Sequence, residues 1–320
     1  MDHERALLIS QAAELACAME MLAPKPGNVS PGRPFKYLNE MTFIASAAAI
    51  AEAFSDPGEP VGELVGRAVR RTKRLTDRNT NLGIILLLAP LVRAANDALA
   101  QQRPGSVKDG VCRSNLRESV LRVLAGLDGR DASAIYSAIK SASPEGLDRS
   151  EKYDVTDFDA LAGDAPPVLE AMRFASSRDS VASEYATGYE ITFGLTAPKL
   201  TALWEEGRPI RDSVVQVFLL LMSEVPDTLI ARKLGREASE AAAAAAGRAL
   251  ELGGCLTAGG RAAVRRLSRM LGDLDNLMNP GTTADLLAAG LFVFLESELE
   301  RTPMPDILAR WDFKGRKDNG

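Results

Sequence analysis

Apolar side chains recur at helical spacing along most of the chain, and no segment alternates between apolar and polar positions as a half-buried strand does. Apolar residues three or four positions apart share one face of a helix, and that face packs against a core. The pattern predicts an all-α fold. The expected helices cover Glu4–Leu22, Met41–Phe54, Val61–Leu75, Leu82–Leu99, Ser114–Leu127, Ala132–Ser141, Pro166–Ser177, Val181–Trp204, Ile210–Glu224, Asp227–Leu252, Gly259–Leu271 and Asn279–Glu300.

One stretch, from Ile84 to Val92, is apolar without interruption. A helix that is apolar on every side is buried on every side, so we expect a central helix that the others surround. Pro90 should kink it. The stretch is about half the length that crosses a bilayer, which argues against a membrane span. We expect a single compact domain over residues 1–313, followed by a polar tail over residues 314–320.

Composition narrows the classes of partner and the compartment. The chain of 320 residues is 46% hydrophobic, enough for a large core, and its net charge of −5 disfavours a general nucleic-acid-binding surface. Cys17, Cys112 and Cys255 lie far apart, which is typical of reduced thiols and not of a disulfide frame or a zinc site. Without a visible signal peptide or targeting tail, we expect a cytoplasmic protein.

The single histidine, His3, lies at the N-terminus, where it is a poor candidate for catalysis. Histidine metal sites and Ser–His–Asp triads therefore become implausible. The remaining chemistry depends on carboxylates, lysine, arginine, hydroxyls and backbone dipoles, together with oxygen ligands that can hold Mg²⁺.

Polar side chains collect at the ends of the predicted helices, where unpaired backbone N–H groups attract anions. The first two groups are Lys25-Pro26-Gly27-Asn28 and Asn79-Thr80-Asn81-Leu82-Gly83. A lysine in a rigid turn can meet a phosphate, and Gly83 allows a ligand or a helix to approach closely. Loops like the first group are more often only connections, and the second group could equally be a helix cap.

Three more groups lie in the second half of the chain. They contain Asp227, Thr228, Arg232 and Lys233; Asp273 and Asp275; and Asn279, Gly281, Thr282, Thr283 and Asp285. Asp227 is a natural N-cap, the second group suits either Mg²⁺ or a solvated turn, and the third suits an anion at a helix start. No P-loop or Gly-x-Gly-x-x-Gly fingerprint accompanies them.

The order of these motifs resembles one family. Lys-Pro-Gly at 25–27, Asn-Thr-x-x-Gly at 79–83, Asp-Thr at 227–228 and Pro-Gly-x-x-Ala-Asp-Leu-Leu-Ala at 280–288 resemble the triphosphoribosyl-dephospho-CoA synthases. The resemblance covers roughly residues 13–294. It implies an all-α enzyme that takes ATP and 3′-dephospho-CoA, releases adenine and joins the triphosphoribosyl group to a hydroxyl of the acceptor.

If the family reaction holds, individual residues take roles in it. Asp227 and Asp285 become the candidate catalytic carboxylates, and Asp273 and Asp275 the candidate ligands of the Mg²⁺ expected with ATP. The candidate nucleotide-binding residues are Lys25, Gly27, Asn28, Asn79, Thr80, Asn81, Gly83, Thr228, Arg232, Lys233, Asn279, Gly281, Thr282 and Thr283. We expect Lys25, Asn79, Asp227 and Asp285 to converge on one cleft. A homo-oligomer is compatible with the sequence.

This chain departs from the family at polar positions. Where the family commonly has Asn-Thr-His-Lys-Gly, Asn81 and Leu82 replace the histidine and the lysine, and Leu229 and Ala231 depart from the pattern after Asp-Thr. These changes leave two alternatives open. One is a related nucleotide-dependent enzyme that makes one-carbon-carrier cofactors of the methanopterin or methanofuran type. The other is a helical protein that binds a nucleotide without turnover.

Overall fold

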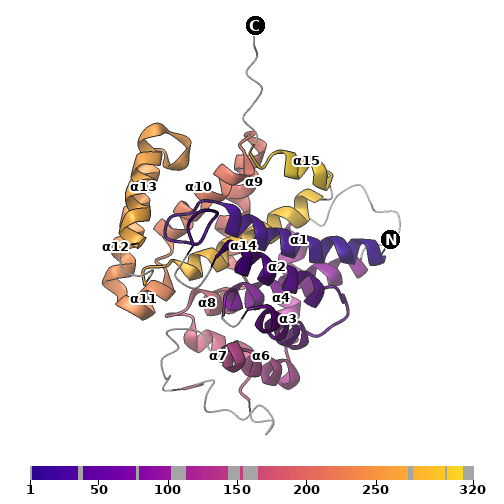
Figure 1. Cartoon of the computed structure of the whole chain (residues 1–320). Coiled ribbons are helices and arrows are strands. Elements are labelled where there is room, and N and C mark those ends of the chain that lie inside the picture. Colours follow the sequence, from indigo (N-terminus) through magenta and orange to yellow (C-terminus); the bar gives the residue numbers. More distant parts are fainter. Residues whose placement is uncertain are drawn as a thin grey trace.

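The computed structural model describes residues 2–34, 39–76, 79–101, 113–142, 152–153, 165–272, 277–299 and 301–312. Over these residues the fold is all-α, as predicted, and the only extended pairing is an isolated bridge between Ser30 and Arg33 (Figure 1). The α-helices are α1 Asp2–Leu22, α2 Glu40–Ala53, α3 Val61–Leu75, α4 Leu82–Ala100, α5 Arg113–Ala125, α6 Gly129–Ala142, α7 Val168–Ala175, α8 Ser180–Thr187, α9 Ala197–Glu205, α10 Ile210–Glu224, α11 Thr228–Leu234, α12 Arg236–Glu251, α13 Ala258–Gly272, α14 Gly281–Leu299 and α15 Met304–Ala309.

Two predicted helices are wrong in their extent, because each is broken by glycine in a left-handed conformation. Within the segment expected as one helix over Val181–Trp204, α8 ends before Gly188 (φ +68°). The chain then continues through a π-helical turn, Thr192–Thr196, into α9. The segment expected as Asp227–Leu252 is divided at Gly235 (φ +88°) into α11 and α12. Helical periodicity runs through both breaks, so the sequence pattern hid them. Helix α15 was not predicted.

Two long helices share the core. All side chains of α4 from Ile84 to Val92 are buried, as predicted for this stretch. Helix α14 is buried from Thr282 to Glu298 with the exception of Asp285, and it packs against α1, α4 and α10 (Figure 1). The expectation of one central helix is therefore not confirmed, because α14 occupies the core as fully as α4 does.

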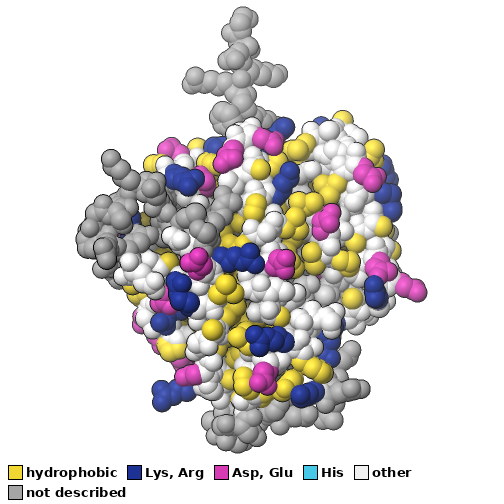
Figure 2. Space-filling view, turned by 180° about the vertical axis from the view of Figure 1, so that it is seen from behind, with side chains coloured by type: hydrophobic (Ala, Val, Ile, Leu, Met, Phe, Trp, Pro, Cys, Tyr) yellow, Lys and Arg dark blue, Asp and Glu magenta, His cyan; other side chains and the backbone are white. Residues whose placement is uncertain are grey.

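The length and composition of α4 would allow it to cross a membrane, but most of its apolar window is buried inside the protein. Core helices of soluble proteins have the same composition. On the face shown in Figure 2, basic, acidic and apolar side chains are interspersed. The two cysteines in the described part of the chain, Cys17 and Cys255, are unpaired thiols.

Pro90 shapes the middle of α4. Because proline has no backbone N–H, the carbonyl of Leu86 loses its usual partner four residues later. The buried hydroxyl of Tyr185 donates to this carbonyl at 2.6 Å, and the hydroxyl of Tyr189 donates to the carbonyl of Leu87 at 2.9 Å. Helix α8 and the turn after it are thus fastened to α4 at its proline.

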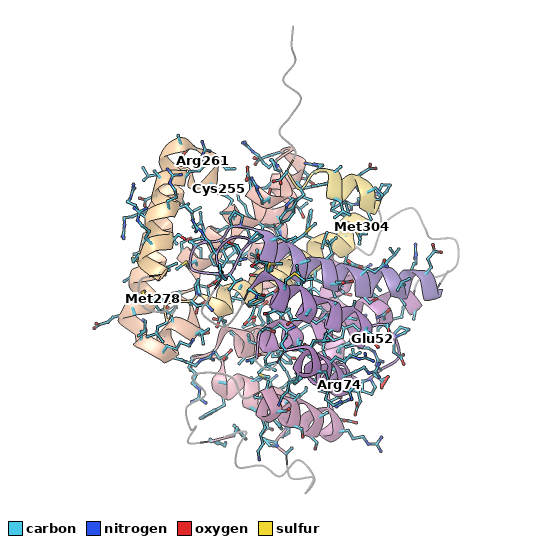
Figure 3. The ribbon with its side chains drawn as sticks, viewed as in Figure 1. Glu52, Arg74, Cys255, Arg261, Met278 and Met304 are labelled. Carbon is cyan, nitrogen blue, oxygen red and sulfur yellow. The ribbon has the colours of Figure 1, made fainter. Side chains whose placement is uncertain are left out.

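Helices α12 and α13 form an antiparallel pair at one side of the molecule (Figure 3). The short 3-10 turn Gly254–Leu256 joins them, and the guanidinium of Arg261 donates to the carbonyl of Cys255 at 3.1 Å. Helix α13 then runs back toward the loop that follows α1, where Gly27 packs against Leu271.

Candidate active site

Four helices begin close to one another: α4, α8, α11 and α14. The backbone N–H of Ser180 donates to the hydroxyl oxygen of Thr228 at 3.3 Å, and this oxygen lies 3.2 Å from the hydroxyl oxygen of Thr282. Gly83, in the first turn of α4, contacts Asp285 in the first turn of α14. The positive ends of four helix dipoles therefore gather in one region, which favours binding of an anion.

Asp227 joins two of these helices. One carboxylate oxygen accepts from the backbone N–H groups of Leu229 at 2.9 Å and Ile230 at 3.0 Å, and so caps α11. The other accepts from the N–H of Thr283 at 2.7 Å and from its hydroxyl at 2.8 Å. Burial raises the pKa of Asp227, and these hydrogen bonds oppose that rise. The N-cap interpretation is confirmed; a catalytic role for Asp227 stays a prediction.

Asp285 has a different environment. A Cβ atom placed on Gly83 would lie 2.0 Å from Oδ2 of Asp285, so the carboxylate lies directly against the glycine backbone. The side chain keeps partial access to solvent, and no described residue donates a hydrogen bond to its carboxylate. Its pKa lies well above the ordinary value of 3.8 because protein atoms remove water from the carboxylate and because Glu20, Asp227 and Asp179 add negative charge; Arg232 opposes the rise.

Arg232 is held beside this carboxylate by Asp179. The guanidinium of Arg232 forms an ion pair with Oδ2 of Asp179, whose Oδ1 caps α8 by accepting from Val181 at 2.8 Å and Ala182 at 3.1 Å. The Nε atom of Arg232 is buried and has no hydrogen-bond partner among the described residues. A buried donor without a partner is costly, so an acceptor on a ligand would be favourable here. Lys233, the next residue, is half-buried.

Lys25 points into the protein. Its side chain is fully buried, its ammonium lies 2.9 Å from a carboxylate oxygen of Glu20, and it also contacts the carbonyls of Glu20 and Ala23. The ammonium lies 5.9 Å from the centroid of the Phe218 ring. Lys25 thus fixes the turn before Gly27. Direct contact between Lys25 and a phosphate stays a prediction, and it requires the ammonium to leave Glu20.

The polar residues before α4 anchor the start of this helix. Oδ1 of the exposed Asn79 accepts from the N–H of Leu82 at 3.1 Å, as a capping side chain does. The hydroxyl of Thr80 lies 2.6 Å from that of Ser46, and the amide of the buried Asn81 donates to the carbonyl of Ser46 at 3.4 Å. These bonds support the capping interpretation, while nucleotide binding by the three residues stays a prediction.

The turn before α14 is closely packed. Asn279 is half-buried and its carbonyl accepts from the N–H of Gly281 at 2.9 Å. Gly281 packs against Leu229, which a Cβ atom at this position would approach to 2.7 Å. Asp273 and Asp275 lie outside the described residues. Within the described part of the chain, no group of three or more His, Cys, Asp or Glu residues is placed to hold a metal.

The structure therefore brings Gly83, Thr228, Thr282, Asp227 and Asp285 together, with Arg232 beside them. Lys25 reaches this region only through Glu20, whose charge also acts on Asp285.

Sequence reasoning missed two carboxylates of the site, Glu20 and Asp179. Asp179 precedes a predicted helix, so its capping position was a usable signal. Glu20 lies within the periodic pattern of α1, and nothing in the sequence distinguishes it from a solvated acidic residue.

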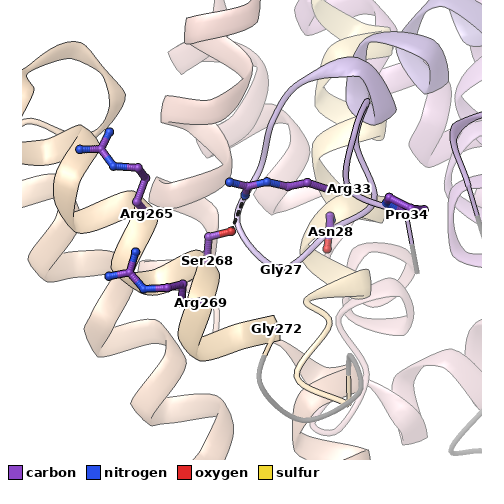
Figure 4. A pocket seen from close by; sticks show the side chains of 8 residues that line it. All are labelled: Gly27, Asn28, Arg33, Pro34, Arg265, Ser268, Arg269 and Gly272. Carbon is purple, nitrogen blue, oxygen red and sulfur yellow. Dashed lines mark hydrogen bonds between the residues drawn. The ribbon is translucent and has the colours of Figure 1, made fainter. Parts of the chain in front are cut away.

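A pocket of about 280 Å³ lies between the loop after α1 and helix α13 (Figure 4). It is lined by Gly27, Asn28, Arg33, Pro34, Arg265, Ser268, Arg269 and Gly272. Gly27 takes a left-handed conformation (φ +76°) and packs so tightly that a Cβ atom would lie 2.9 Å from Pro280, just before α14. The pocket therefore adjoins the start of α14, the helix that carries Asp285.

These features define an all-α protein with a polar site, built from helix starts around a carboxylate of raised pKa. The family model described as ATP:dephospho-CoA triphosphoribosyl transferase (CitG) matches residues 6–303, and the chain belongs to this family.

A protein from Stutzerimonas stutzeri that carries the name 2-(5''-triphosphoribosyl)-3'-dephosphocoenzyme-A synthase is 36% identical over 97 residues. The match covers 30% of this chain and about a third (32%) of that relative. A crystal structure from Archaeoglobus fulgidus, of a protein assigned the name triphosphoribosyl-dephospho-CoA synthase, is similar with a TM-score of 0.60 and 27% identity. It covers 79% of this chain and 98% of that one.

Proposed function

We propose that this protein transfers the triphosphoribosyl group of ATP to a hydroxyl of 3′-dephospho-CoA and releases adenine. The family match over residues 6–303 supports the reaction class. The observation that carries the proposal is the carboxylate of Asp285. It has no described hydrogen-bond partner and a raised pKa, and it lies where α4 and α14 begin.

In the proposed reaction, the bond between C1′ of the ATP ribose and the adenine nitrogen breaks while a new bond forms between C1′ and the acceptor oxygen. Positive charge develops on the sugar, and a nearby carboxylate stabilises it. Asp285 accepts the proton that the acceptor hydroxyl loses, and adenine takes up a proton from solvent as it leaves. A raised pKa makes Asp285 a stronger base once ionised.

The helix starts and the basic side chains would meet the phosphates. The helix dipoles of α4 and α14 favour anions near their first turns, and the hydroxyls of Thr228 and Thr282 lie at the start of α11 and α14. Arg232 supplies a buried Nε donor without a partner. Asp179 positions this arginine, while Asp227 positions α11 relative to α14.

Magnesium remains a proposal that depends on ATP. Because the described residues hold no cluster of metal ligands, the phosphate oxygens would be its main ligands, as is common for Mg²⁺ bound with nucleotides. Asp273 and Asp275 are the proposed protein ligands of this ion. We also propose a cytoplasmic location, where ATP is abundant and thiols stay reduced.

A changed acceptor is the alternative that a specific observation favours. Asn81 and Leu82, which replace the family's histidine and lysine, are both buried, and Asn81 bonds to the backbone of α2. They offer no charge to a ligand. A related acceptor, such as a precursor of a one-carbon-carrier cofactor, would use the same carboxylate and the same ATP site.

Product analysis distinguishes transfer to 3′-dephospho-CoA from transfer to another acceptor. The protein is incubated with ATP and Mg²⁺, with or without 3′-dephospho-CoA, and the products are identified by mass spectrometry. Adenine that appears only with the acceptor, together with the triphosphoribosyl adduct, is the expected result. Formation of ADP or AMP would contradict glycosyl transfer. Absence of turnover with this acceptor, despite ATP binding, would favour another acceptor or a binding role.

A further inference from the structure

The pocket between the loop after α1 and helix α13 has a basic lining. Three of its residues are arginines, Arg33, Arg265 and Arg269, and none of the described lining residues is acidic. Three arginines that line a volume of about 280 Å³ suit a compact anion with several charges.

The three arginines belong to two elements. Arg33 reaches from the loop across to α13, where its guanidinium donates to the hydroxyl of Ser268 at 2.6 Å (Figure 4). Arg265 and Arg269 are exposed, and their guanidinium groups extend outward from α13 in the same view. Within the described part of the chain, no ion pair holds either group in this rotamer.

Asn28 gives the pocket a buried polar wall. Asn28 is only 8% exposed, and its Oδ1 atom has no hydrogen-bond partner among the described residues. A buried acceptor without a partner is costly, so a hydroxyl or amino group of a ligand would stabilise it. This second feature is independent of the arginine charges and points to an occupant with both anionic and donor groups.

The backbone connects the pocket to the site around Asp285. Gly27 lies between them and packs against Leu271 of α13 on one side and Pro280 on the other. The pocket therefore lies next to the start of the helix that carries Asp285.

We propose that this pocket binds the polyphosphate chain of a substrate, with Arg33, Arg265 and Arg269 as its charge partners and Asn28 as acceptor for a neighbouring hydroxyl. The chain is either the triphosphate of ATP or the diphosphate of 3′-dephospho-CoA. The choice between these sources rests on the proposed function, whereas recognition of a polyphosphate does not.

Titration calorimetry with inorganic triphosphate, without magnesium and at low salt, tests the recognition directly. The variants are the double change Arg265→Gln with Arg269→Gln, and Arg266→Gln as a matched control, because Arg266 is an exposed arginine of α13 outside the pocket. Loss of two charge-assisted contacts should weaken binding by about tenfold or more, while the control changes it by less than about twofold.

Equal weakening by Arg266→Gln would show that only the general charge of α13 matters, and would overturn the proposal. So would the absence of binding to the wild-type protein. Asn28→Asp keeps the shape of the side chain but adds a negative charge inside the pocket, so it should also abolish binding of triphosphate. Thermal melting checks that this variant is folded. If it is not, Arg33→Gln replaces it, and the loss of this one arginine should weaken triphosphate binding by about threefold to tenfold.

The source of the phosphates is read from separate titrations with ATP, adenosine and 3′-dephospho-CoA. The double variant should lose affinity for either ATP or 3′-dephospho-CoA and keep its affinity for adenosine. Unchanged affinity for both phosphorylated substrates would contradict the assignment of the pocket to a substrate. If triphosphate binding depends on the arginines but the proposed reaction is not observed, the polyphosphate pocket is supported and only the proposed activity is contradicted.

Discussion

Asp227 and Asp285 differ in what surrounds each carboxylate, although both lie at helix starts of the same site. Asp227 accepts four hydrogen bonds and ties α11 to α14. Asp285 receives none from the described residues and lies among other negative charges. The same change, from aspartate to asparagine, should therefore affect the two positions in opposite ways.

We expect Asp285→Asn to raise the melting temperature at and above neutral pH. The pKa of Asp285 is raised well above 3.8 in the folded protein. At pH values between 3.8 and this raised pKa, the folded protein therefore binds more protons than the unfolded chain. The free energy of unfolding therefore falls as pH rises through this window, and removing the charge restores it. The advantage over the wild type should shrink as pH falls toward 3.8. A lower melting temperature at pH 8 would contradict the environment described for Asp285.

We expect Asp227→Asn to lower stability by about 1–3 kcal/mol, because an asparagine NH₂ group would face N–H or O–H donors that now meet a carboxylate oxygen. Urea unfolding of this variant and of Asp285→Asn, measured side by side at pH 8, provides the comparison. Stabilisation of both variants would show that the hydrogen bonds to Asp227 do not outweigh its burial.

Gly83 should be required for activity because of its contact with Asp285. In a helix, alanine normally stabilises relative to glycine, but here its Cβ atom would lie 2.0 Å from the carboxylate. We expect Gly83→Ala to displace Asp285 and to reduce turnover by about tenfold to hundredfold. Gly129→Ala is the control, because a Cβ atom there meets nothing within 4 Å. Normal turnover of Gly83→Ala would show that the position of Asp285 is unimportant.

At the scale of the elements, the proline of α4 and the tyrosine of α8 form a compensating pair. Tyr185→Phe leaves the carbonyl of Leu86 without its donor, and we expect a loss of about 1–3 kcal/mol in the free energy of unfolding. In a Pro90→Ala background, the new N–H of residue 90 can bond to this carbonyl, so the same change should cost less. A double-mutant cycle measures the difference, and additive effects would rule out the coupling.

The bounds of a helix could be predicted where the spacing of its apolar residues is regular. Helix α4 begins at Leu82 as expected and α10 has its predicted bounds, because both combine a clear apolar pattern with a clear polar start. The breaks at Gly188 and Gly235 could not be predicted, because a single glycine can lie either inside a helix or at its left-handed end. Tertiary packing decides between the two, and the sequence pattern does not contain it.

At the scale of the whole molecule, the sequence located the candidate site only in part. The polar groups at helix starts identified Asp227, Asp285 and Gly83, since dipoles and caps are local properties. The contact of Gly83 with Asp285 depends on how α4 packs against α14, which local patterns do not determine. Local patterns also do not determine the pocket lined by Arg33, Arg265 and Arg269, because its lining comes from the loop after α1 and from α13.

The central claim is that one carboxylate, at the meeting point of helix starts, serves a glycosyl transfer from ATP. Adenine release from ATP, measured with 3′-dephospho-CoA for the wild type and for Asp285→Asn at equal folded concentration, tests it most directly. The account predicts release by the wild type that depends on the acceptor, and a fall of about hundredfold or more in the variant, which stays folded and binds ATP. Release at the wild-type rate by Asp285→Asn would contradict it.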